Sequence, residues 1–599
     1  MPNTIRLIQA DKGFPAKREF SEHHYWVFLG RDYKRLLELK NQAPANWHYV
    51  EIGSLLEDAA NDLRRSYLDY VGELSVCFNS LAWWCSKIAE KNVMDSPVYL
   101  YICYLEVVNR LKKELSGKNV CIFSESTAVL ETISRSDLFN GYKNIKLYKT
   151  NAFKSYLRAA ARFFLSLKQA FTRKLWARKP SISDNKPLTI LRTWIGDKHL
   201  SQNGEFKDSY FANLAGELRG KGETVAILPI FYNLRRSIRE TFAWLRQAKE
   251  NFIIADDYYR ITDYFKGLYV MFRSLTFFKG SFVFQGHELG LIYREEARRT
   301  AFAGGSAFEV VMHYYLMERL SEKGVKIERI IITFENMFPE KPILLGAEKY
   351  LPDATILGFQ HASLFPLLLS CYASKNEAGV LPTPNKIICS GSYFREILSK
   401  EGFSSECLVD GPALRFQYLI RQYGRGDRPQ NTVLITLPLA KPNALELLSK
   451  SWSALRNTKH MKLVLKPHPM MAKEDLSEII NLAGLKTDEY ELVGGGMSDV
   501  LPNATMLIAT ASATIFDALA WGVPVIRVRS DLDISLDPMD WFSKDDFQFT
   551  ARTTEEIAAE IEKIKSIDQA KEIKLREKGR ELIAQCFSPV NEESLAVFL

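Results

Sequence analysis

The sequence predicts an α/β protein with two Rossmann-like domains that face a cleft, preceded by a smaller α/β domain. Short apolar runs recur along the chain and helical patterns separate them, which is typical of doubly wound parallel sheets. The polar stretch YGRGDRPQN at 423–431 divides the longer part of the chain into two such series. With 599 residues, the chain is long enough for two or three domains.

Residues 1–150 predict a small α/β accessory domain. The strand-like runs are IRLIQA, YWVFLG and NVCIFSE. They alternate with two helical patterns, LLEDAANDLRRSYLDYV and YLYICYLEVVNRLKKEL. Each run is short, apolar and followed by polar residues, as expected for a strand of a half-buried sheet.

Residues 151–187 predict a basic amphipathic helix and a linker. The part 151–180 carries eight Lys or Arg residues and no acid. Apolar side chains recur there at helical spacing, at Phe153, Leu157, Ala160, Phe164, Leu167, Phe171 and Leu175. One interpretation is a helix packed on a domain with a solvated basic face. The other is an amphipathic helix lying on an anionic membrane surface, and the pattern fits both equally.

The two Rossmann-like domains are predicted at 188–425 and 430–599. The strands expected in the first are LTILRTWI at 188–195, TVAILPI, RIIITFE at 329–335, ATILGFQ at 354–360 and KIICSG at 386–391. Those expected in the second are NTVLITLPL, KLVLKP, TMLIAT and VPVIRV, followed by C-terminal helices. Because ligands of open α/β sheets bind at the carboxyl ends of the strands, the cleft between the domains is the expected site.

The composition is that of a globular protein, with 47% hydrophobic and 25% charged residues. The net charge of +8 is mild for this length and does not indicate nucleic-acid binding. The eight cysteines form no C-x-x-C pair, so neither a zinc knuckle nor a disulfide framework is predicted. The first residues lack a signal-peptide core, and no long apolar run occurs. A cytoplasmic location is therefore expected.

A lysine and a histidine end one strand of the second domain. In LVLKPHPMM, the apolar run stops at Lys466, and His468 follows between two prolines. Prolines fix the backbone, so they can hold the imidazole toward a cleft. The alternative is an ordinary polar loop at the edge of the sheet.

Hydroxyl side chains lie at the next strand-to-helix junction, in ATASATIFDALAWGVPV. Thr510, Ser512 and Thr514 precede or begin a helix expected near Ala513. The N-terminus of a helix offers free N–H groups and favours an anion such as a phosphate. Alone, this is an N-cap; together with KPHP it favours phosphate binding. Asp517, one turn later, is placed to accept a hydrogen bond from a sugar or ribose hydroxyl.

Two strands of the first domain also end in polar pairs. Glu335 and Asn336 follow RIIITF, and Gln360 and His361 follow ATILGF. An apolar strand leads into Glu335, so a raised pKa is expected, which suits a general base or a nucleophile. The alternatives for Glu335 are capping the next helix or pairing with Lys341. His361 is expected to donate to a leaving phosphate or to act as an acid, or else is a loop histidine.

Two further polar clusters carry less weight. His287 and Glu288 in FQGHELG have no spacing that favours a site. Asp256 and Asp257 in IIADDYY are similar to the acidic pairs that hold metals in other transferases, but the sequence offers no third ligand. No metal and no cofactor are therefore predicted.

These motifs resemble a known family. KPHP, the hydroxyl-rich turn ending in G-x-P and the two Rossmann-like halves resemble GT-B glycosyltransferases. The His-Pro pair and the hydroxyl motif are similar to those of bacterial sialyltransferases and other enzymes with cytidine-nucleotide donors, where the histidine contacts the donor phosphate. The stretch TFENMFPEKPILLGAEKYLPDATILGFQHASLFPLL resembles bacterial surface-carbohydrate (capsule and O-antigen) biosynthesis proteins. The resemblance covers about residues 188–575, and Val409-Asp410-Gly411 matches the sialyltransferase acidic motif only in part.

The resemblance implies a metal-independent glycosyltransferase of bacterial surface polysaccharide biosynthesis. The donor would be a nucleotide-activated sugar, a CMP-linked ulosonic acid of the 3-deoxy-octulosonate or nonulosonate type, bound by the second domain. The acceptor would be a glycan or lipid-linked glycan, bound by the first domain. The expected catalytic residues are Glu335 and His361, and Asn336, Gln360 and Asp410 are expected to contact acceptor or sugar.

Three alternatives remain open at this point. KPHP also suits polyol-phosphate transferases that use CDP-glycerol. A non-catalytic nucleotide- or sugar-binding subunit of an assembly complex would need the phosphate site but no acid–base pair, and an epimerase acting on a UDP-sugar would share the fold. In the glycosyltransferase interpretation, the helix at 151–180 would place a cytoplasmic enzyme at the inner face of the inner membrane.

Overall fold

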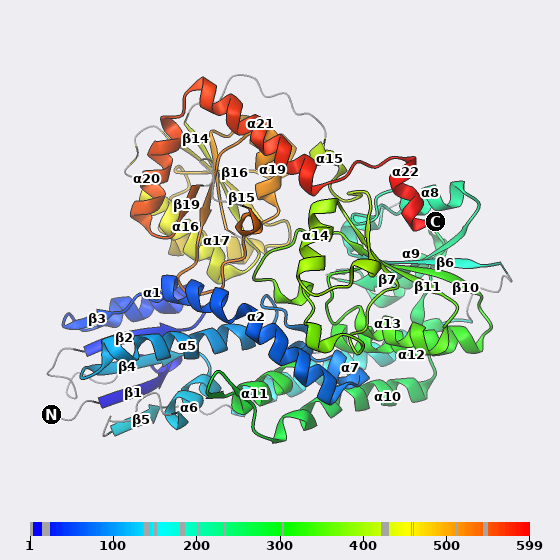
Figure 1. Cartoon of the computed structure of the whole chain (residues 1–599), viewed down its shortest axis with the longest axis horizontal. Coiled ribbons are helices and arrows are strands. Elements are labelled where there is room, and N and C mark those ends of the chain that lie inside the picture. Colours follow the sequence, from blue (N-terminus) through cyan, green and yellow to red (C-terminus); the bar gives the residue numbers. More distant parts are fainter. Residues whose placement is uncertain are drawn as a thin grey trace.

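Three parallel sheets and their helices make up the computed structural model (Figure 1). It describes residues 4–14, 24–136, 144–148, 153–179, 186–420 apart from 202, 233 and 302–304, 431–542 apart from 457, 459–460 and 511, and 549–599. The predicted fold class, two Rossmann-like domains preceded by a smaller α/β domain, is confirmed by the strand order of these sheets.

The N-terminal sheet has the order β3-β2-β4-β1-β5, and all its pairings are parallel. Its strands are β1 Thr4–Gln9, β2 His24–Leu29, β3 Trp47–Tyr49, β4 Asn119–Ser124 and β5 Asn144–Tyr148. Its helices are α1 Tyr33–Gln42, α2 Gly53–Phe78, α3 Leu81–Trp84, α4 Lys87–Glu90, α5 Val98–Leu115 and α6 Thr127–Arg135. The three predicted strands and both predicted helices are present, while the short edge strands β3 and β5 were not anticipated.

The middle sheet has the order β13-β12-β11-β10-β6-β7. Its strands are β6 Leu188–Ile195, β7 Thr224–Phe231, β10 Ile327–Thr333, β11 Thr355–Gln360, β12 Lys386–Cys389 and β13 Leu408–Asp410, and β8 Val283–Phe284 and β9 His287–Glu288 form a separate hairpin. Its helices are α8 Leu214–Gly220, α9 Ile238–Gln247, α10 Ile261–Arg273, α11 Gly290–Ala301, α12 Gly305–Glu322, α13 Lys341–Tyr350, α14 Ser392–Lys400 and α15 Gln417–Ile420. The order in which strands are added to the sheet reverses between β6 and β10. The crevice at the carboxyl ends of these two strands is therefore the expected ligand position.

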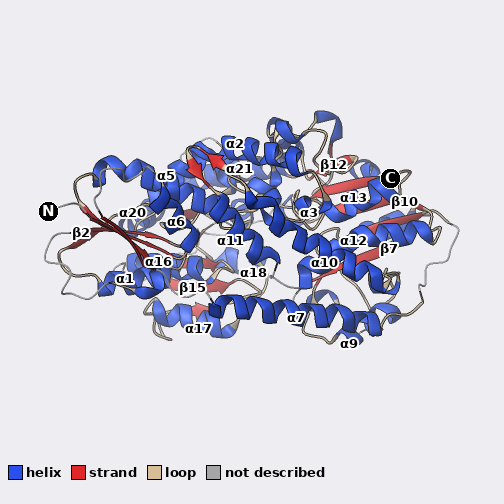
Figure 2. Ribbon diagram, turned by 90° about the horizontal axis from the view of Figure 1, so that it is seen from below, coloured by secondary structure: helices blue, strands red, loops and turns tan. Residues whose placement is uncertain are grey.

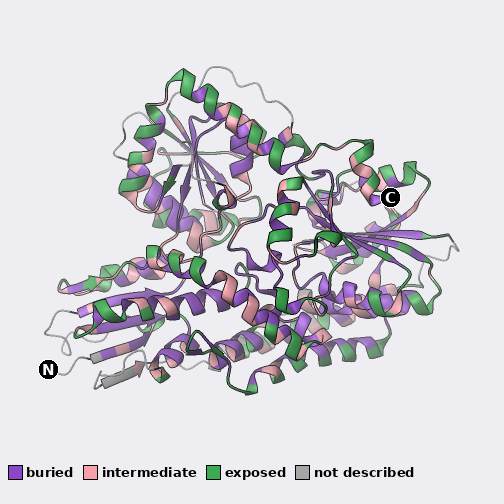
Figure 3. Ribbon diagram, in the orientation of Figure 1, coloured by how far each residue is buried: buried purple, intermediate pink, exposed green. Residues whose placement is uncertain are grey.

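The C-terminal sheet has the order β16-β15-β14-β17-β18-β19, which is the strand order of a Rossmann fold with its reversal between β14 and β17. Its strands are β14 Thr432–Leu437, β15 Lys462–Pro467, β16 Glu491–Leu492, β17 Met506–Ala509, β18 Val525–Val528 and β19 Phe549–Ala551. Its helices are α16 Lys441–Leu455, α17 Lys473–Leu482, α18 Met497–Val500, α19 Thr514–Trp521, α20 Thr554–Lys565 and α21 Gln569–Cys586. Figure 3 shows the strands of this sheet and of the middle sheet buried, with exposed residues on the outer helix faces.

The end of the chain returns to the middle sheet. Ser588 donates a 2.8 Å backbone hydrogen bond to Ser390, and α22 Glu592–Leu595 leads to Phe598, which packs with Leu191 and Phe359. The chain therefore passes between the two Rossmann-like domains twice, once before β14 and once after α21. Residues 423–430 of the predicted linker lie outside the described residues, so a domain boundary there stays a prediction.

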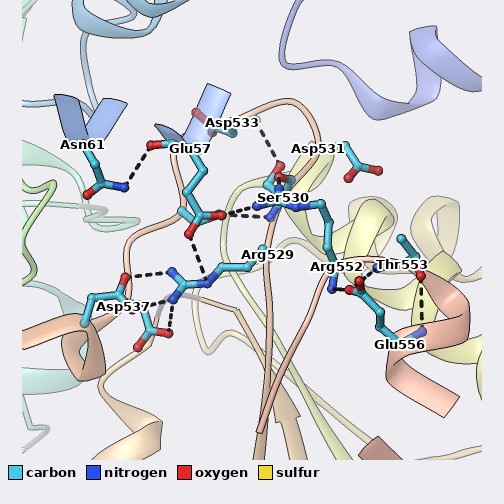
Figure 4. A network of polar contacts seen from close by, with 12 residues as sticks. Glu57, Asn61, Arg529, Ser530, Asp531, Asp533, Asp537, Arg552, Thr553 and Glu556 are labelled. Carbon is cyan, nitrogen blue, oxygen red and sulfur yellow. Dashed lines mark hydrogen bonds and ion pairs between the residues drawn. The ribbon is translucent and has the colours of Figure 1, made fainter. Parts of the chain in front are cut away.

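The N-terminal domain contacts both other domains. Figure 4 shows Glu57 of α2 pointing at Arg529 and Arg552 of the C-terminal domain. Arg529 in turn donates to Asp540 at 2.8 Å. On the other side, Lys91 forms a buried 2.7 Å ion pair with Glu377 of the middle domain. The N-terminal domain therefore packs against both Rossmann-like domains.

The basic segment forms one long helix, α7 Phe153–Leu175, which covers part of the middle domain. Phe163 and Ala170 are buried, and the ring of Phe171 stacks on Tyr264 at 5.5 Å. Leu157, Phe164 and Leu175 of the predicted apolar stripe are exposed, and of that stripe Phe171 makes the ring contact. Phe163 and Ala170 do not belong to the predicted stripe, so the helix packs mainly through a neighbouring side.

Candidate functional site

The two reversal points of the large sheets face one another. Glu335 follows β10 at the first, next to the segment that carries Lys198 after β6. Thr510 follows β17 at the second, and the KPHP turn follows β15, with β14 between these two strands. Burial lowers the pKa of His468, and the positive charge of Lys198 from the other domain lowers it further. These edges are where the sequence predicts the cleft, and the cleft itself stays a prediction.

Glu335 lies at the edge of the middle sheet beside a small cavity, which Phe334, Gln360 and Leu364 also line. Burial raises the pKa of its carboxyl to about 7, with Arg415 opposing this shift. The backbone N–H of Glu335 donates to Glu340 at 2.8 Å, which fixes the turn. A carboxylate with this pKa is half-ionised near neutral pH, as a general base requires.

The neighbouring Asn336 has a structural role in this turn. Its φ of +57° is in the left-handed region, which costs energy for a residue with a Cβ. Lys341 donates to its side-chain oxygen, and its amide donates to the carbonyl of Ser370 at 2.9 Å. Lys341 thus pairs with Asn336 and not with Glu335, which removes the alternative in which Glu335 is a salt-bridge partner.

Arg415 is the central residue that the sequence did not indicate. It lies on the segment between β13 and α15, and its exposed guanidinium donates to Nδ1 of His361 at 3.1 Å. Its guanidinium carbon lies 5.3 Å from the ring centre of Tyr210. Burial raises the pKa of Glu335 and of Asp517, and the charge of Arg415 opposes both shifts, although these two residues belong to different domains.

His361 is held in the neutral form. Burial, followed by the charge of Arg415, lowers its pKa well below the usual value. Because Nδ1 accepts from Arg415, the ring proton is assigned to Nε2, which is buried and has no hydrogen-bond partner among the described residues. This arrangement suits a residue that orients Arg415 better than one that donates a proton as an imidazolium.

The side chains of Gln360 and Asp410 have local hydrogen-bond or ion-pair partners. The amide of Gln360 donates to the carbonyl of Ala362, and its oxygen accepts from the backbone N–H of Ser390 at 3.1 Å. Asp410 ends the edge strand β13 and pairs with Arg395 at 2.8 Å. β13 is three strands from β10, which corresponds to about 14 Å. Their predicted contacts with acceptor or sugar stay predictions without support from side-chain geometry.

In the C-terminal domain, His468 is oriented for donation. Its Nδ1 accepts the backbone N–H of Met470 at 3.2 Å, so Nε2 carries the proton and can donate to a phosphate oxygen. Lys466 is buried along its stem and donates to the carbonyl of Gly495 at 2.6 Å. Burial lowers the pKa of Lys466, while Asp499 opposes the shift.

The hydroxyl turn adjoins the N-terminus of α19, as predicted. Ser512 Oγ accepts from the backbone N–H of Thr514 at 3.2 Å and from its hydroxyl at 2.9 Å. A phosphate oxygen at this turn would be an acceptor for the Ser512 hydroxyl. Asp517 lies one turn into α19, where burial raises its pKa to about 7 against a hydrogen bond from Tyr418.

A cavity of about 290 Å³ lies between α7 and the middle domain beside β7. Tyr232 lines it, and burial raises the pKa of Tyr232, while a hydrogen bond with Tyr210 and the charge of Arg415 oppose that shift. Inside, Arg173 of α7 pairs with Glu309 at 2.5 Å. Six of its lining residues are Phe or Tyr, and these are Phe231, Tyr232, Phe242, Tyr259, Tyr264 and Phe308.

The other acidic clusters have local partners. Asp256 lines this cavity and accepts from Tyr264 at 3.2 Å, and Asp257 pairs with Arg246 at 2.8 Å. Glu288 accepts backbone N–H groups of its own hairpin, including that of Gly290 at 2.9 Å. Within the described part of the chain, no group of three or more His, Cys, Asp or Glu side chains could hold a metal ion.

Comparison with known proteins does not assign the chain to a family. No protein-family model matches the chain, and no curated protein matches it in sequence. Similar solved structures include a glycosyltransferase from Rickettsia africae (12% identity, 69% of this chain and 97% of that chain, TM-score 0.40). Anabaena HepE in complex with UDP-glucose (11%, 69% and 98%, 0.39) and S. aureus MnaA with UDP (12%, 68% and 94%, 0.38) are others. At these identities and scores the likeness carries no argument about function, and the fold rests on the sheet topology.

Proposed function

We propose that the chain is a glycosyltransferase that moves a sugar from a nucleotide-activated donor to a glycan hydroxyl. The observation that carries the proposal is the grouping around Arg415. A carboxylate with a pKa near 7, Glu335, lies on one side of it, and the α19 turn with Asp517 lies on the other. A pure binding protein would need the phosphate-binding side but no base opposite it.

In the proposed reaction, Glu335 accepts the proton of the acceptor hydroxyl as its oxygen attacks the anomeric carbon of the donor. The bond from that carbon to the donor phosphate breaks, and the phosphate oxygen leaves with the electron pair. Arg415, with Nε2–H of His468 and the hydroxyl of Ser512, would stabilise the negative charge that develops there. Neutral His361 would keep Arg415 in position.

The finer assignments are also proposals. The KPHP and hydroxyl motifs support a CMP-linked ulosonic acid as donor. The 290 Å³ cavity, with six Phe or Tyr residues and the ion pair of Arg173 and Glu309 in its lining, would hold the sugar of a glycan or lipid-linked glycan acceptor. The product would belong to a bacterial surface polysaccharide. The basic helix α7 would bring a cytoplasmic enzyme to an anionic membrane, where lipid-linked acceptors are found.

The proposal is tested by incubating the protein with CMP-, UDP- and GDP-sugars and CDP-glycerol in the presence of a lipid-linked glycan extract. Acceptor-dependent release of a nucleotide together with a glycosylated product is expected. Release of CMP with glycerol phosphate transferred would identify the CDP-glycerol alternative. Epimerisation of a UDP-sugar without transfer, or binding without turnover, would contradict the proposal.

Replacing Ser512 with Ala is expected to weaken nucleotide binding by about 1 to 2 kcal/mol, the scale of one hydrogen bond to a charged group. The variant lacks the hydroxyl that is proposed to donate to the phosphate, and that also accepts from Thr514. Titration calorimetry measures the affinity, and Ser498→Ala, an exposed hydroxyl on α18, serves as the control. Equal affinities for Ser512→Ala and the unchanged protein would reduce Ser512 to a helix cap.

A further inference from the structure

The largest gathering of exposed apolar side chains lies on two neighbouring helices of the middle domain. Nineteen large apolar residues are exposed in the described part of the chain, and nine of them belong to α7, the residue after it, and α10. These helices are a small part of the chain, so the concentration is not the scatter expected of an ordinary surface. Figure 2, seen from below, shows both helices on that side of the molecule.

On α10 the exposed apolar residues form one stripe. Ile261, Phe265, Tyr269 and Phe272 are spaced four, four and three residues apart, which places them on a single side of the helix. Phe265 is 61% exposed and Tyr269 is 62% exposed. The opposite side of α10 already packs into the domain, so the stripe is not the packing face.

The outward flank of α7 continues this surface. Phe164, at 66% exposure, contacts the ring of Phe163, and Phe163 contacts Phe272 of α10 at 5.3 Å between ring centres. Leu157 and Leu175 lie on the same outward side of α7 and are exposed as well. The apolar residues of the two helices therefore meet at Phe163 and form one continuous face, here called the α7–α10 face.

Exposed basic residues border the α7–α10 face in the described part of the chain. On α7 and the residues after it these are Lys168, Arg178 and Lys179, whereas Arg173 pairs with Glu309 inside the cavity. The single acid of α10, Asp263, is buried in a 2.8 Å ion pair with Arg319. Lys266 and Arg273, next to the apolar stripe, are exposed, although Lys266 lies within 3.8 Å of Glu318.

We propose that the α7–α10 face is the surface by which this protein binds an anionic lipid bilayer, with the α10 stripe inserted at the headgroup level. Aromatic and aliphatic residues in the interface, with Lys and Arg beside them, fit the acyl boundary and the anionic headgroups together. The proposal extends the membrane role of α7 stated above and does not depend on the transfer reaction. Among the described residues, none of the helices has the length and apolar character to span a bilayer.

The cavity that would hold the acceptor sugar lies behind the same helix. Arg173 of α7 lines it, and Tyr264 and Phe308 separate it from the α10 stripe. A bilayer bound at the α7–α10 face would place lipid headgroups one helix away from this cavity. The basic residues of the α7–α10 face favour anionic lipids. Binding of a bilayer there would bring lipid-linked acceptors close to the cavity.

The test is co-sedimentation of the full chain with phosphatidylglycerol vesicles and with pure phosphatidylcholine vesicles. We expect binding to phosphatidylglycerol that weakens as NaCl approaches 1 M, where the Debye length is about 3 Å. The double variant F265S/Y269S should bind these vesicles at least about tenfold more weakly. The control I573S/L492S removes two exposed apolar residues from the C-terminal domain and should bind normally.

Two further measurements keep the outcomes distinct. Thermal unfolding and nucleotide titration of F265S/Y269S should match the unchanged protein, since α10 lies outside the nucleotide side of the cleft. Absence of binding to phosphatidylglycerol at low salt, or equal binding by F265S/Y269S, would overturn the proposal. An oligomer that F265S/Y269S converts to a monomer would overturn it too, by identifying the face as an interface between copies. If the protein binds vesicles but no nucleotide, this result contradicts the proposed transferase activity and not the proposed lipid-binding surface.

Discussion

Glu335→Gln is expected to lower the rate of sugar transfer by a factor of at least about 100, the lower range for loss of a general base. The amide keeps the size of the side chain and the hydrogen bond from the backbone of Glu335 to Glu340. It cannot accept the proton of the acceptor hydroxyl. Nucleotide affinity should stay unchanged, because the nucleotide is assigned to the opposite side of the cleft.

The matched control for this variant is Asp410→Asn. Asp410 is also a carboxylate at the end of a strand of the middle sheet, but it is exposed and pairs with Arg395. Its replacement should leave the transfer rate close to normal. Full activity in Glu335→Gln would move the base elsewhere, and Asp517, whose pKa is also about 7, would then be the first residue to examine.

Arg415→Ala is expected to slow transfer by about 100- to 1,000-fold, the scale for removing one group that stabilises developing charge. It should also shift the pH profile. Arg415 lowers the pKa of Glu335, so its loss raises that pKa above about 7. Activity requires the ionised carboxylate, and the acidic limb of the profile therefore moves to higher pH.

The shift in the pH profile separates this role from a structural one. Arg415→Lys keeps a positive charge and should leave the acidic limb near its original pH while losing the fork-shaped contact. Arg395→Ala, which removes an arginine paired with Asp410 at 2.8 Å, serves as the control and should change neither rate nor profile. An Arg415→Ala enzyme that is slow but has an unshifted acidic limb would show that Arg415 does not act on Glu335.

The strands that could be predicted from the sequence are those whose interior is continuous and apolar. LTILRTWI and KLVLKP match β6 and β15 residue for residue. Edge strands such as β13, Leu408–Asp410, and β16, Glu491–Leu492, are only two or three residues long and half polar, so no periodicity marks them. No local pattern in the sequence predicts that the C-terminal residues return to the middle sheet.

The candidate site was predictable in part. Glu335, His468 and Ser512 could be found because each follows an apolar strand, and parallel strands bring their carboxyl ends to one edge. Arg415 and Lys198 could not, because they gain their positions from the way two domains meet. Similarly, the sequence of α10 is apolar on several sides, and only the packed structure shows which of its aromatic residues remain outside.

The central claim is that the cleft between the two Rossmann-like domains binds the phosphate of a nucleotide through the KPHP turn. The most direct measurement is titration calorimetry of the unchanged protein and of His468→Ala with CMP, CDP, UDP and GDP. The account predicts that at least one of them binds, with CMP or CDP preferred, and that His468→Ala binds it at least about tenfold more weakly with an unaltered thermal unfolding transition. Binding of none of the four, or equal binding by both proteins, would contradict the account.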